Sequence, residues 1–282
     1  MPAYIFQADI NKFDVNTTRY NGENALVLAD CASLVYKPEA EIKQAITGTW
    51  KFKKFTYFSG ESTQAFIAGN ESIIIVSFRG TEILKLADIK SDIKLILTET
   101  GIALLPGKVH AGFKDALHEV WGGMLATIKG FQDNKQSVWF CGQSLGGALA
   151  TLAVAEFIGN EKNSINGLYT LGQPRVGNAK FAGQFDRMIG DRCFRFVNNN
   201  DIVPQLPLWS PMLQYTHIGN LIYLDSEGKL NDSTPLVKHI WDRLRGATDD
   251  IGQIGLDHLK DHSYDIYVEL IKKNRSVTTK WS

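Results

Sequence analysis

The sequence predicts an α/β protein in which a mostly parallel central sheet carries helices on both faces. Short runs of β-branched and aromatic residues, typical of buried strands, alternate with apolar stretches of helical length. One such pair is adjacent, because the strand-like run 137–141 passes through a glycine-rich turn into the helix-like run 147–157. No repeat, linker or low-complexity segment interrupts the alternation, so residues 1–282 are expected to form a single domain.

The predicted elements follow from this alternation. β-branched and aromatic runs with turn residues at their ends predict strands at 64–69, 72–78, 137–141, 167–171, 193–197 and 217–224. Apolar residues at helical spacing predict helices at 23–36, 113–130, 147–157, 178–189, 235–246 and about 263–273. Residues 82–98 form a mostly apolar, amphipathic stretch. Because parallel strands end at a common edge, functional residues are expected on the loops there.

The charge and hydropathy of the sequence argue against nucleic-acid binding and against a membrane-spanning segment. The 282-residue chain has 30 basic and 30 acidic side chains and no long basic run, so nucleic-acid binding has no electrostatic support. Its longest apolar stretch, 147–155, is too short to span a bilayer. We therefore expect neither a nucleic-acid partner nor a transmembrane segment.

The cysteines bear on the cellular compartment. Cys31, Cys141 and Cys193 are odd in number and widely spaced, which favours reduced, buried thiols over disulfides. Residues 1–9 lack the basic and apolar regions of a secretory signal peptide. Both observations predict a cytoplasmic protein, with secretion as the alternative if a leader precedes this sequence.

Residues 142–146, Gly-Gln-Ser-Leu-Gly, form the most informative motif of the chain. A strand before it and a helix after it are typical of the nucleophile elbow of α/β-hydrolases. Ser144 would occupy a sharp turn, and Gly142 and Gly146 lack the Cβ atoms that would keep strand and helix apart. The helix N-terminus then directs N–H groups and the positive end of its dipole at developing negative charge. Ser144 is therefore the candidate nucleophile.

A serine nucleophile needs a base, and that base needs a carboxylate to orient it. In this fold the acid and then the histidine follow the serine, and the later histidines are His217, His239, His258 and His262. The base normally lies just before the last helix, and His262 directly precedes that predicted helix. Histidines four residues apart could also hold a metal, but Leu259 stands where a zinc protease motif has Glu. No metal is therefore expected, and His258 is expected to cap a helix or to hydrogen-bond near the site.

Asp201 is the candidate acid. It opens the loop after the predicted strand 193–197, which places it at a strand's carboxyl end. Asp225, after the next strand, is the alternative. An aspartate in a turn more often serves as a cap or in an Asx-turn, but the position of Asp201 in the chain order favours it.

Further motifs accompany these residues. They are Val-Ser-Phe-Arg-Gly-Thr at 76–81, Val-His-Ala-Gly-Phe at 109–113, the elbow at 142–147, Thr-Leu-Gly-Gln-Pro-Arg-Val-Gly-Asn at 170–178, Asn-Asp-Ile-Val-Pro-Gln-Leu-Pro at 200–207, and His262 with Tyr264. Together and in this order they resemble the class 3 lipase family, the fungal triacylglycerol lipase-like branch of the α/β-hydrolases.

The resemblance implies roles for individual residues. Ser144, Asp201 and His262 would be the catalytic triad. Thr81, through its backbone N–H and hydroxyl, and Leu145, through its N–H, would form the oxyanion hole. His110, which precedes the serine, would be supporting structure near the site, outside the triad.

The implied activity is hydrolysis of an acylglycerol or another carboxylic ester through an acyl-enzyme, at a lipid–water interface and without a metal or organic cofactor. An apolar set near the site fits a lipid substrate: Leu206, Leu208, Trp209, Met212 and Leu213. Phospholipase A1 or feruloyl esterase activity on the same scaffold, peptide hydrolysis, and a non-catalytic lipase-like scaffold are the alternatives.

One segment departs from the resemblance. Related chains carry a lid helix after the oxyanion residue with Trp near its end, whereas residues 81–89 are amphipathic and end in Ile89. This segment is expected to cover the site in water and to open on lipid, with a helix packed on the core as the alternative. Residues 230–255 are a second candidate cap. Secreted fungal members carry disulfides that these cysteines do not support.

Overall fold

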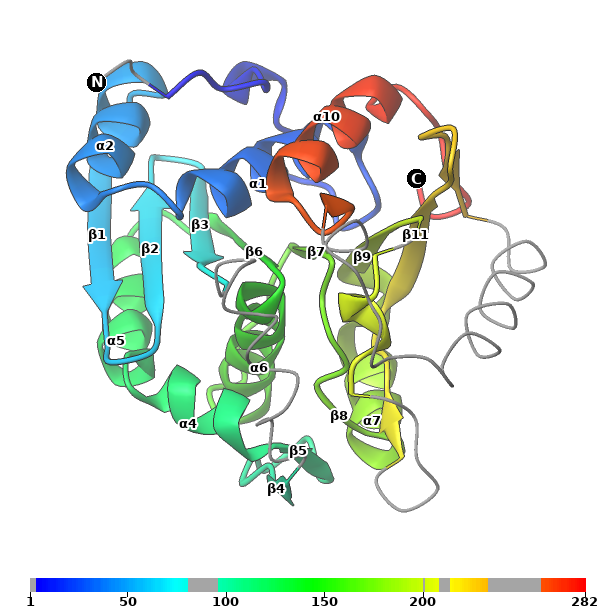
Figure 1. Ribbon diagram of the computed structural model, residues 1–282. Coiled ribbons are helices and arrows are strands. Elements are labelled where there is room, and N and C mark those ends of the chain that lie inside the picture. The colour runs from blue at the N-terminus through cyan, green and yellow to red at the C-terminus, as the bar shows by residue number, and fades with distance from the viewer. Residues whose placement is uncertain (1–3, 81–95, 200, 208–213, 233–259) are drawn as a thin grey trace.

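A sheet of eight strands in the order β1-β2-β3-β6-β7-β9-β11-β12 organises the part of the chain that the computed structural model describes, residues 4–80, 96–199, 201–207, 214–232 and 260–282 (Figure 1). The strands of this sheet are β1 Lys54–Ser59, β2 Gln64–Gly69, β3 Ile73–Phe78, β6 Ser137–Gln143, β7 Gly167–Leu171, β9 Cys193–Asn198, β11 Asn220–Leu224 and β12 Leu230–Asn231. β3, β6, β7, β9 and β11 run parallel to one another, while β1, β2 and β12 pair antiparallel at the two edges. The prediction of a mostly parallel central sheet is confirmed.

Helices cover both faces of this sheet (Figure 1). One face carries α4 Ala111–His118, α5 Trp121–Phe131, α6 Leu145–Gly159 and α7 Ala179–Ile189, and the other carries α1 Gly22–Leu34, α2 Glu39–Lys43 and α10 Tyr264–Asn274. A helical turn at Gln44–Thr49 continues α2. The side chains of β6 explain the two layers, because Val138 and Phe140 join one hydrophobic cluster while Trp139 and Cys141 join the other.

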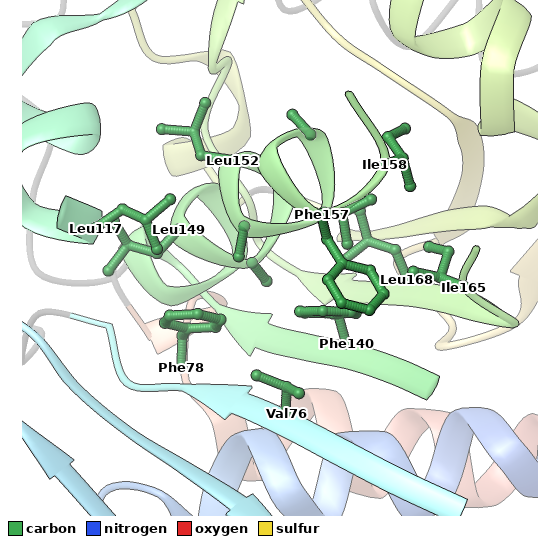
Figure 2. Close-up of a cluster of buried hydrophobic side chains, with 14 of the residues drawn as sticks. Val76, Phe78, Leu117, Phe140, Leu149, Leu152, Phe157, Ile158, Ile165 and Leu168 are labelled. Atoms are coloured by element: carbon green, nitrogen blue, oxygen red, sulfur yellow. The ribbon is translucent and has the colours of Figure 1, made fainter. Parts of the chain in front are cut away.

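Helix α6 packs its apolar residues directly on the parallel strands. Figure 2 shows Leu149, Leu152 and Phe157 of this helix above Phe78 of β3 and Phe140 of β6. Every residue of α6 after Leu145 is buried. Burying an aromatic or aliphatic side chain contributes about 1.5–3 kcal/mol, so this helix is held against the sheet along its whole length.

One predicted helix is wrong in its extent. The stretch expected as a single helix at 113–130 forms α4 and α5, which are separated at Glu119 and Val120. Val120 leaves the helical region with φ −123° and ψ −16°. The carboxylate of Glu119 accepts hydrogen bonds from the backbone N–H groups of Ser62 and Thr63 at 2.9 and 3.2 Å, which ties the chain to the β1–β2 turn at this break.

Several short elements have no counterpart in the prediction. They include β1, β12, α2 and a small antiparallel sheet with the order β10-β8-β5-β4, formed by β4 Leu97–Glu99, β5 Lys108–His110, β8 Gly177–Asn178 and β10 Tyr215–Thr216. The strand predicted at 217–224 begins only at Asn220 as β11, and the two residues of β10 lie in the other sheet.

Several sequence expectations lie outside the described residues. They include the predicted helix at 235–246, the lid segment 81–89 and residues 233–255 of the second candidate cap. Within the described part of the chain, no helix has the length and apolarity needed to cross a membrane. Cys31, Cys141 and Cys193 are all free and buried, as expected from their spacing.

Candidate active site

Ser144 lies on the strained turn between β6 and α6. Its backbone has φ 58° and ψ −130°, a region that residues with a side chain rarely adopt. A Cβ at Gly142 would lie 2.3 Å from the backbone C and O of Gly146, and a Cβ at Gly146 would lie 2.2 Å from the Phe78 carbonyl oxygen. Only glycine at both positions allows the strand and helix to meet at this turn.

The Ser144 hydroxyl is buried. Among the residues that the structure describes, its Oγ has no hydrogen-bond partner, although Ser144 is 0% exposed, and its backbone N–H donates to the Leu171 carbonyl at 2.8 Å. The first N–H groups of a helix have no carbonyl one turn earlier to bond. Leu145, half-buried at the start of α6, therefore offers its N–H beside the serine. Negative charge that develops near Ser144 would meet this N–H and the positive end of the helix dipole.

Asp201 and His262 form a buried hydrogen-bonded pair. Oδ2 of Asp201 lies 2.8 Å from Nδ1 of His262, and both side chains are 0% exposed. Asp201 follows β9, and its backbone N–H donates to the Asn198 carbonyl at 2.8 Å. Its Oδ1 accepts the Val203 N–H at 2.9 Å, which fixes the carboxylate plane. With Nδ1 donating to the carboxylate, the lone pair of the imidazole lies on Nε2, which is buried and has no hydrogen-bond partner in the described part of the chain.

Tyr267 of α10 supports this pair. Its hydroxyl donates to Oδ2 of Asp201 at 2.6 Å and accepts the Asn198 N–H at 2.9 Å. Burial, and then the negative charge of Asp201, raises the pKa of Tyr267 well above its usual value. The phenol therefore stays protonated and acts as a permanent donor to the carboxylate.

Gly172, directly after β7, lies against the same pair. Its φ is +57°, and a Cβ there would lie 2.7 Å from Oδ2 of Asp201 and 2.8 Å from Nδ1 of His262. The lack of a side chain thus leaves the space that the two groups occupy. The sequence motif at 170–178 contains this glycine, but its spacing alone does not indicate the role.

The three candidate residues from the sequence gather at one edge of the sheet. Ser144 follows β6, Asp201 follows β9, and His262 comes just before α10. Nε2 of Gln143, the residue before Ser144, donates to the His262 carbonyl at 2.6 Å, which ties the histidine to the nucleophile strand. Oγ of Ser144 and Nε2 of His262 are both unbonded in the described structure. Thr81, the other oxyanion candidate, and His258 lie outside the described residues.

The alternative acid, Asp225, serves a turn after β11. Its Oδ1 accepts the N–H groups of Glu227 and Lys229 at 3.0 and 2.9 Å, and its Oδ2 accepts from Nδ2 of Asn231 at 2.9 Å. These bonds are those of an Asx-type turn. The structure gives Asp225 no bond to His262 among the described contacts, whereas Asp201 has one.

His110 supports a helix terminus. It precedes α4, and its Nδ1 accepts the Phe113 N–H at 3.3 Å while its ring stacks on that of Phe113 at 4.1 Å between centroids. Burial lowers the pKa of His110, so the ring is neutral in this role.

Comparisons with known proteins agree with this architecture. Residues 75–210 match the sequence model of the family described as lipase (class 3). A triacylglycerol lipase of Arabidopsis thaliana is 26% identical over 288 residues, which cover 77% of this chain and 55% of the relative. A lipase of Rhizomucor miehei is 35% identical over 159 residues, which cover 51% of this chain and 41% of the relative. The chain thus spans about half the length of these curated relatives.

Solved structures share the fold. Lipase II from Rhizopus niveus superimposes with a TM-score of 0.61 at 24% identity, over 73% of this chain and 81% of that chain. A triacylglycerol lipase whose catalytic centre is formed by a serine protease triad superimposes with a TM-score of 0.58 at 27% identity, over 73% and 82% of the two chains. The fold is that of the α/β-hydrolases, and over residues 75–210 the chain matches the class 3 lipase family.

Proposed function

We propose that the protein hydrolyses carboxylic esters of lipids, with Ser144 as nucleophile, His262 as base and Asp201 as the orienting acid. The observation that carries this proposal is the buried 2.8 Å contact between His262 Nδ1 and Asp201 Oδ2, beside a strained Ser144 turn. The relatives named above as triacylglycerol lipases support the choice of lipid esters as the substrate class.

The geometry of the Asp201–His262 pair supports the following reaction. Asp201 holds the proton on Nδ1 of His262, which leaves Nε2 free to take the proton of the Ser144 hydroxyl. The serine oxygen attacks the acyl carbonyl, and the tetrahedral intermediate collapses to an acyl-enzyme as His262 protonates the departing alcohol. Water then attacks the acyl-enzyme with His262 again as base, which releases the acid and restores Ser144. None of these steps requires a cofactor.

The negative charge of the tetrahedral intermediate needs fixed donors. We assign them to the N–H of Leu145 and to the backbone N–H and hydroxyl of Thr81. The position of Gly80, the residue before Thr81, supports this assignment, because a Cβ built on Gly80 would lie 3.0 Å from Cβ of Ser144. Loss of one such donor typically costs about 10²–10³ in rate. Turnover by Thr81→Val at the wild-type rate, with Thr81→Ser as the hydroxyl-retaining control, would rule out the side-chain contribution.

The first experiment compares initial rates on a soluble short-chain nitrophenyl ester. Ser144→Ala is expected to lower kcat by about 10⁴-fold or more, and Asp201→Asn by about 10⁴-fold. Ser137→Ala is the matched control, since Ser137 lies at the other end of β6 and should retain wild-type kcat. Equal turnover by wild type and Ser144→Ala would contradict the assignment.

The substrate class needs a second assay. Emulsified tributyrin and trioleoylglycerol, with fatty acid release followed by titration, test action on lipid esters. A jump in rate as an ester passes its solubility limit would support an interface-dependent lid, and a smooth rise would count against it. A folded wild type that cleaves the soluble ester and no glyceride, with or without detergent, would overturn the lipid assignment and leave a general esterase.

A further inference from the structure

Tyr36, just past the end of α1, bridges two parts of the active site. Its hydroxyl donates to Oε1 of Gln143 at 2.6 Å and accepts the backbone N–H of Gly80 at 3.1 Å. Gln143 is the residue before Ser144, and Gly80 is the residue before Thr81. A single phenol oxygen therefore connects the turn after β3 to the end of β6.

Gln143 extends this connection to the histidine. Its side chain is buried, and its Nε2 donates to the backbone carbonyl of His262 at 2.6 Å. The result is a directed chain of hydrogen bonds from the Gly80 N–H through the Tyr36 hydroxyl and the Gln143 amide to the His262 carbonyl. None of the donors and acceptors in this series of hydrogen bonds carries a charge.

The ring of Tyr36 is itself held in place. It stacks on Tyr264 with 4.7 Å between centroids and 25° between planes, and the Arg79 guanidinium lies 5.4 Å from its centroid. A Cβ at Gly80 would lie 2.5 Å from the Tyr36 oxygen and 2.4 Å from the Gln143 carbonyl oxygen, so glycine is required for this approach. The hydroxyl therefore has a fixed position to which both neighbouring segments are bound.

We infer that Tyr36 is a positioning residue that sets the oxyanion turn and the backbone of His262 relative to Ser144. The inference rests on the function proposed above and names a residue outside the triad and the oxyanion hole. Tyr36 touches neither substrate nor reacting atoms in this role. Its hydroxyl fixes the Arg79–Gly80 peptide, which leads into Thr81, and through Gln143 it fixes the carbonyl of His262. Base and oxyanion donors act only when they are held close to their productive geometry.

The test is Tyr36→Phe, which removes the hydroxyl and keeps the ring on Tyr264. We expect kcat on the soluble nitrophenyl ester to fall by about 10- to 100-fold with KM within about twofold of wild type. The rate of Ser144 labelling by a fluorophosphonate, followed by mass spectrometry, should fall in parallel, because formation of that adduct also needs the base and the oxyanion donors.

Tyr169→Phe is the matched control. The Tyr169 hydroxyl is bound at the other end of α1, where it accepts the Asn21 N–H at 3.2 Å. Its loss should weaken the anchoring of α1 without changing kcat or the labelling rate. An equal loss of kcat in both variants would show that Tyr36 acts only through the general stability of α1, and would overturn the inference.

A double-mutant cycle tests whether Tyr36 and Gln143 act through the same series of hydrogen bonds. Tyr36→Phe and Gln143→Met both break this series, so the fold-loss of kcat in the double variant should be smaller than the product of the two separate fold-losses. Multiplicative losses of kcat in the double variant, or wild-type kcat in Tyr36→Phe, would contradict the positioning role of Tyr36.

The labelling assay separates this inference from the proposed function. If wild type is labelled at Ser144 but cleaves no ester, the proposed substrate class fails while the labelling rates of Tyr36→Phe and Tyr169→Phe still decide the role of Tyr36. If the folded wild type is neither labelled nor active, both the function and the role of Tyr36 are overturned.

Discussion

Tyr267 donates its hydroxyl hydrogen to Oδ2 of Asp201 at 2.6 Å, the same oxygen that His262 contacts through Nδ1. The carboxylate therefore has donors from α10, from the loop before it and, through Val203 N–H on Oδ1, from its own loop. Such charge-assisted hydrogen bonds are roughly twice as strong as neutral ones. They fix the orientation of Asp201, whose side chain is 0% exposed.

Tyr267→Phe is expected to lower both activity and stability. The variant loses one donor to Asp201 and leaves the buried Asn198 N–H without its acceptor, which costs about 1–3 kcal/mol in the free energy of unfolding. A looser carboxylate should reduce kcat by about 10-fold with little change in KM. Ester kinetics and urea denaturation measure the two effects. Tyr223→Phe is the control and should stay near wild type, because the Tyr223 hydroxyl donates to Oδ1 of Asn199, just past β9, at 3.3 Å. Wild-type kcat in Tyr267→Phe would contradict the role of Tyr267.

Gly172→Ala tests the space left for the Asp201–His262 pair. An added Cβ would meet both groups at under 3 Å and would also sit at φ +57°, a conformation that costs a non-glycine residue about 1–2 kcal/mol. We expect kcat to fall by about 10²-fold or more. Gly101→Ala is the control, since Gly101 has φ +71° and a Cβ there would find its nearest atom, Nζ of Lys114, at 3.4 Å. If both variants lose stability equally and both keep kcat, the close contact at Gly172 is not important for activity.

Asp30 makes stability depend on pH. This carboxylate of α1 is buried, and its Oδ2 accepts the N–H groups of Gln7 and Ala8 at 2.8 Å each. Burial raises its pKa from the usual 3.8 to about 7, because the hydrogen bonds to these N–H groups offset only part of the desolvation. The folded state thus binds a proton that the unfolded state releases, and the stability contributed by protonated Asp30 is present below pH 4 and lost as pH rises toward about 7.

Asp30→Asn should remove this pH dependence. Asparagine has nearly the same shape, still accepts both N–H groups, and carries no charge. We compare the free energies of unfolding of Asp30→Asn and wild type. The value for the variant minus that for wild type should increase between about pH 4 and pH 7. The increase is about 1.4 kcal/mol per unit of pKa shift, or a few kcal/mol in all. Urea denaturation at pH 4, 5.5 and 8 measures it, with the exposed Asp115→Asn as control. A pH-independent difference between Asp30→Asn and wild type would rule out Asp30 as the source.

The thiols should react only when the protein opens. Cys31, Cys141 and Cys193 are buried and free, and burial raises the pKa of Cys31 and Cys193 well above the usual value. Little reactive thiolate is therefore exposed in the folded protein. An aromatic disulfide reagent should label no thiol over minutes in native buffer and all three in denaturant. Rapid native labelling of any one would show local opening at that cysteine.

The sequence predicts the centre of this fold better than its edges. Strand β6, the Ser144 turn and α6 are predicted because apolar runs and obligatory glycines coincide there. Strand β1 is missed although residues 55–58 are a run of aromatic and β-branched residues. It lies at the edge of the sheet, and its side chains are mostly half-buried. The predicted helix at 113–130 is wrong across Val120 because the apolar spacing continues where the backbone does not.

The candidate site divides in the same way. The order of residues in the chain and their positions at strand ends identify Ser144, Asp201 and His262 as candidates, and the structure places Asp201 and His262 in contact. Tyr267 and Tyr36 could not be found in this way, because their partners are distant in sequence. Tyr267 lies 66 residues from Asp201, and Tyr36 lies 107 residues from Gln143. In the sequence, an aromatic residue on a helix indicates only a core position. The neighbouring residues carry no signal for which carboxylate or amide its hydroxyl will hydrogen-bond.

The placement of His262 and Tyr267 after the strands β6 and β9 has a consequence for biosynthesis. The strands that carry Ser144 and Asp201 are translated before residues 260–274, and domains form as the ribosome proceeds from the amino terminus. Under the proposed assignment, a nascent chain that still lacks α10 has a nucleophile without a base. Hydrolytic competence then arises only when α10 docks against α1, so the cell meets no active ester hydrolase until translation of this region is complete.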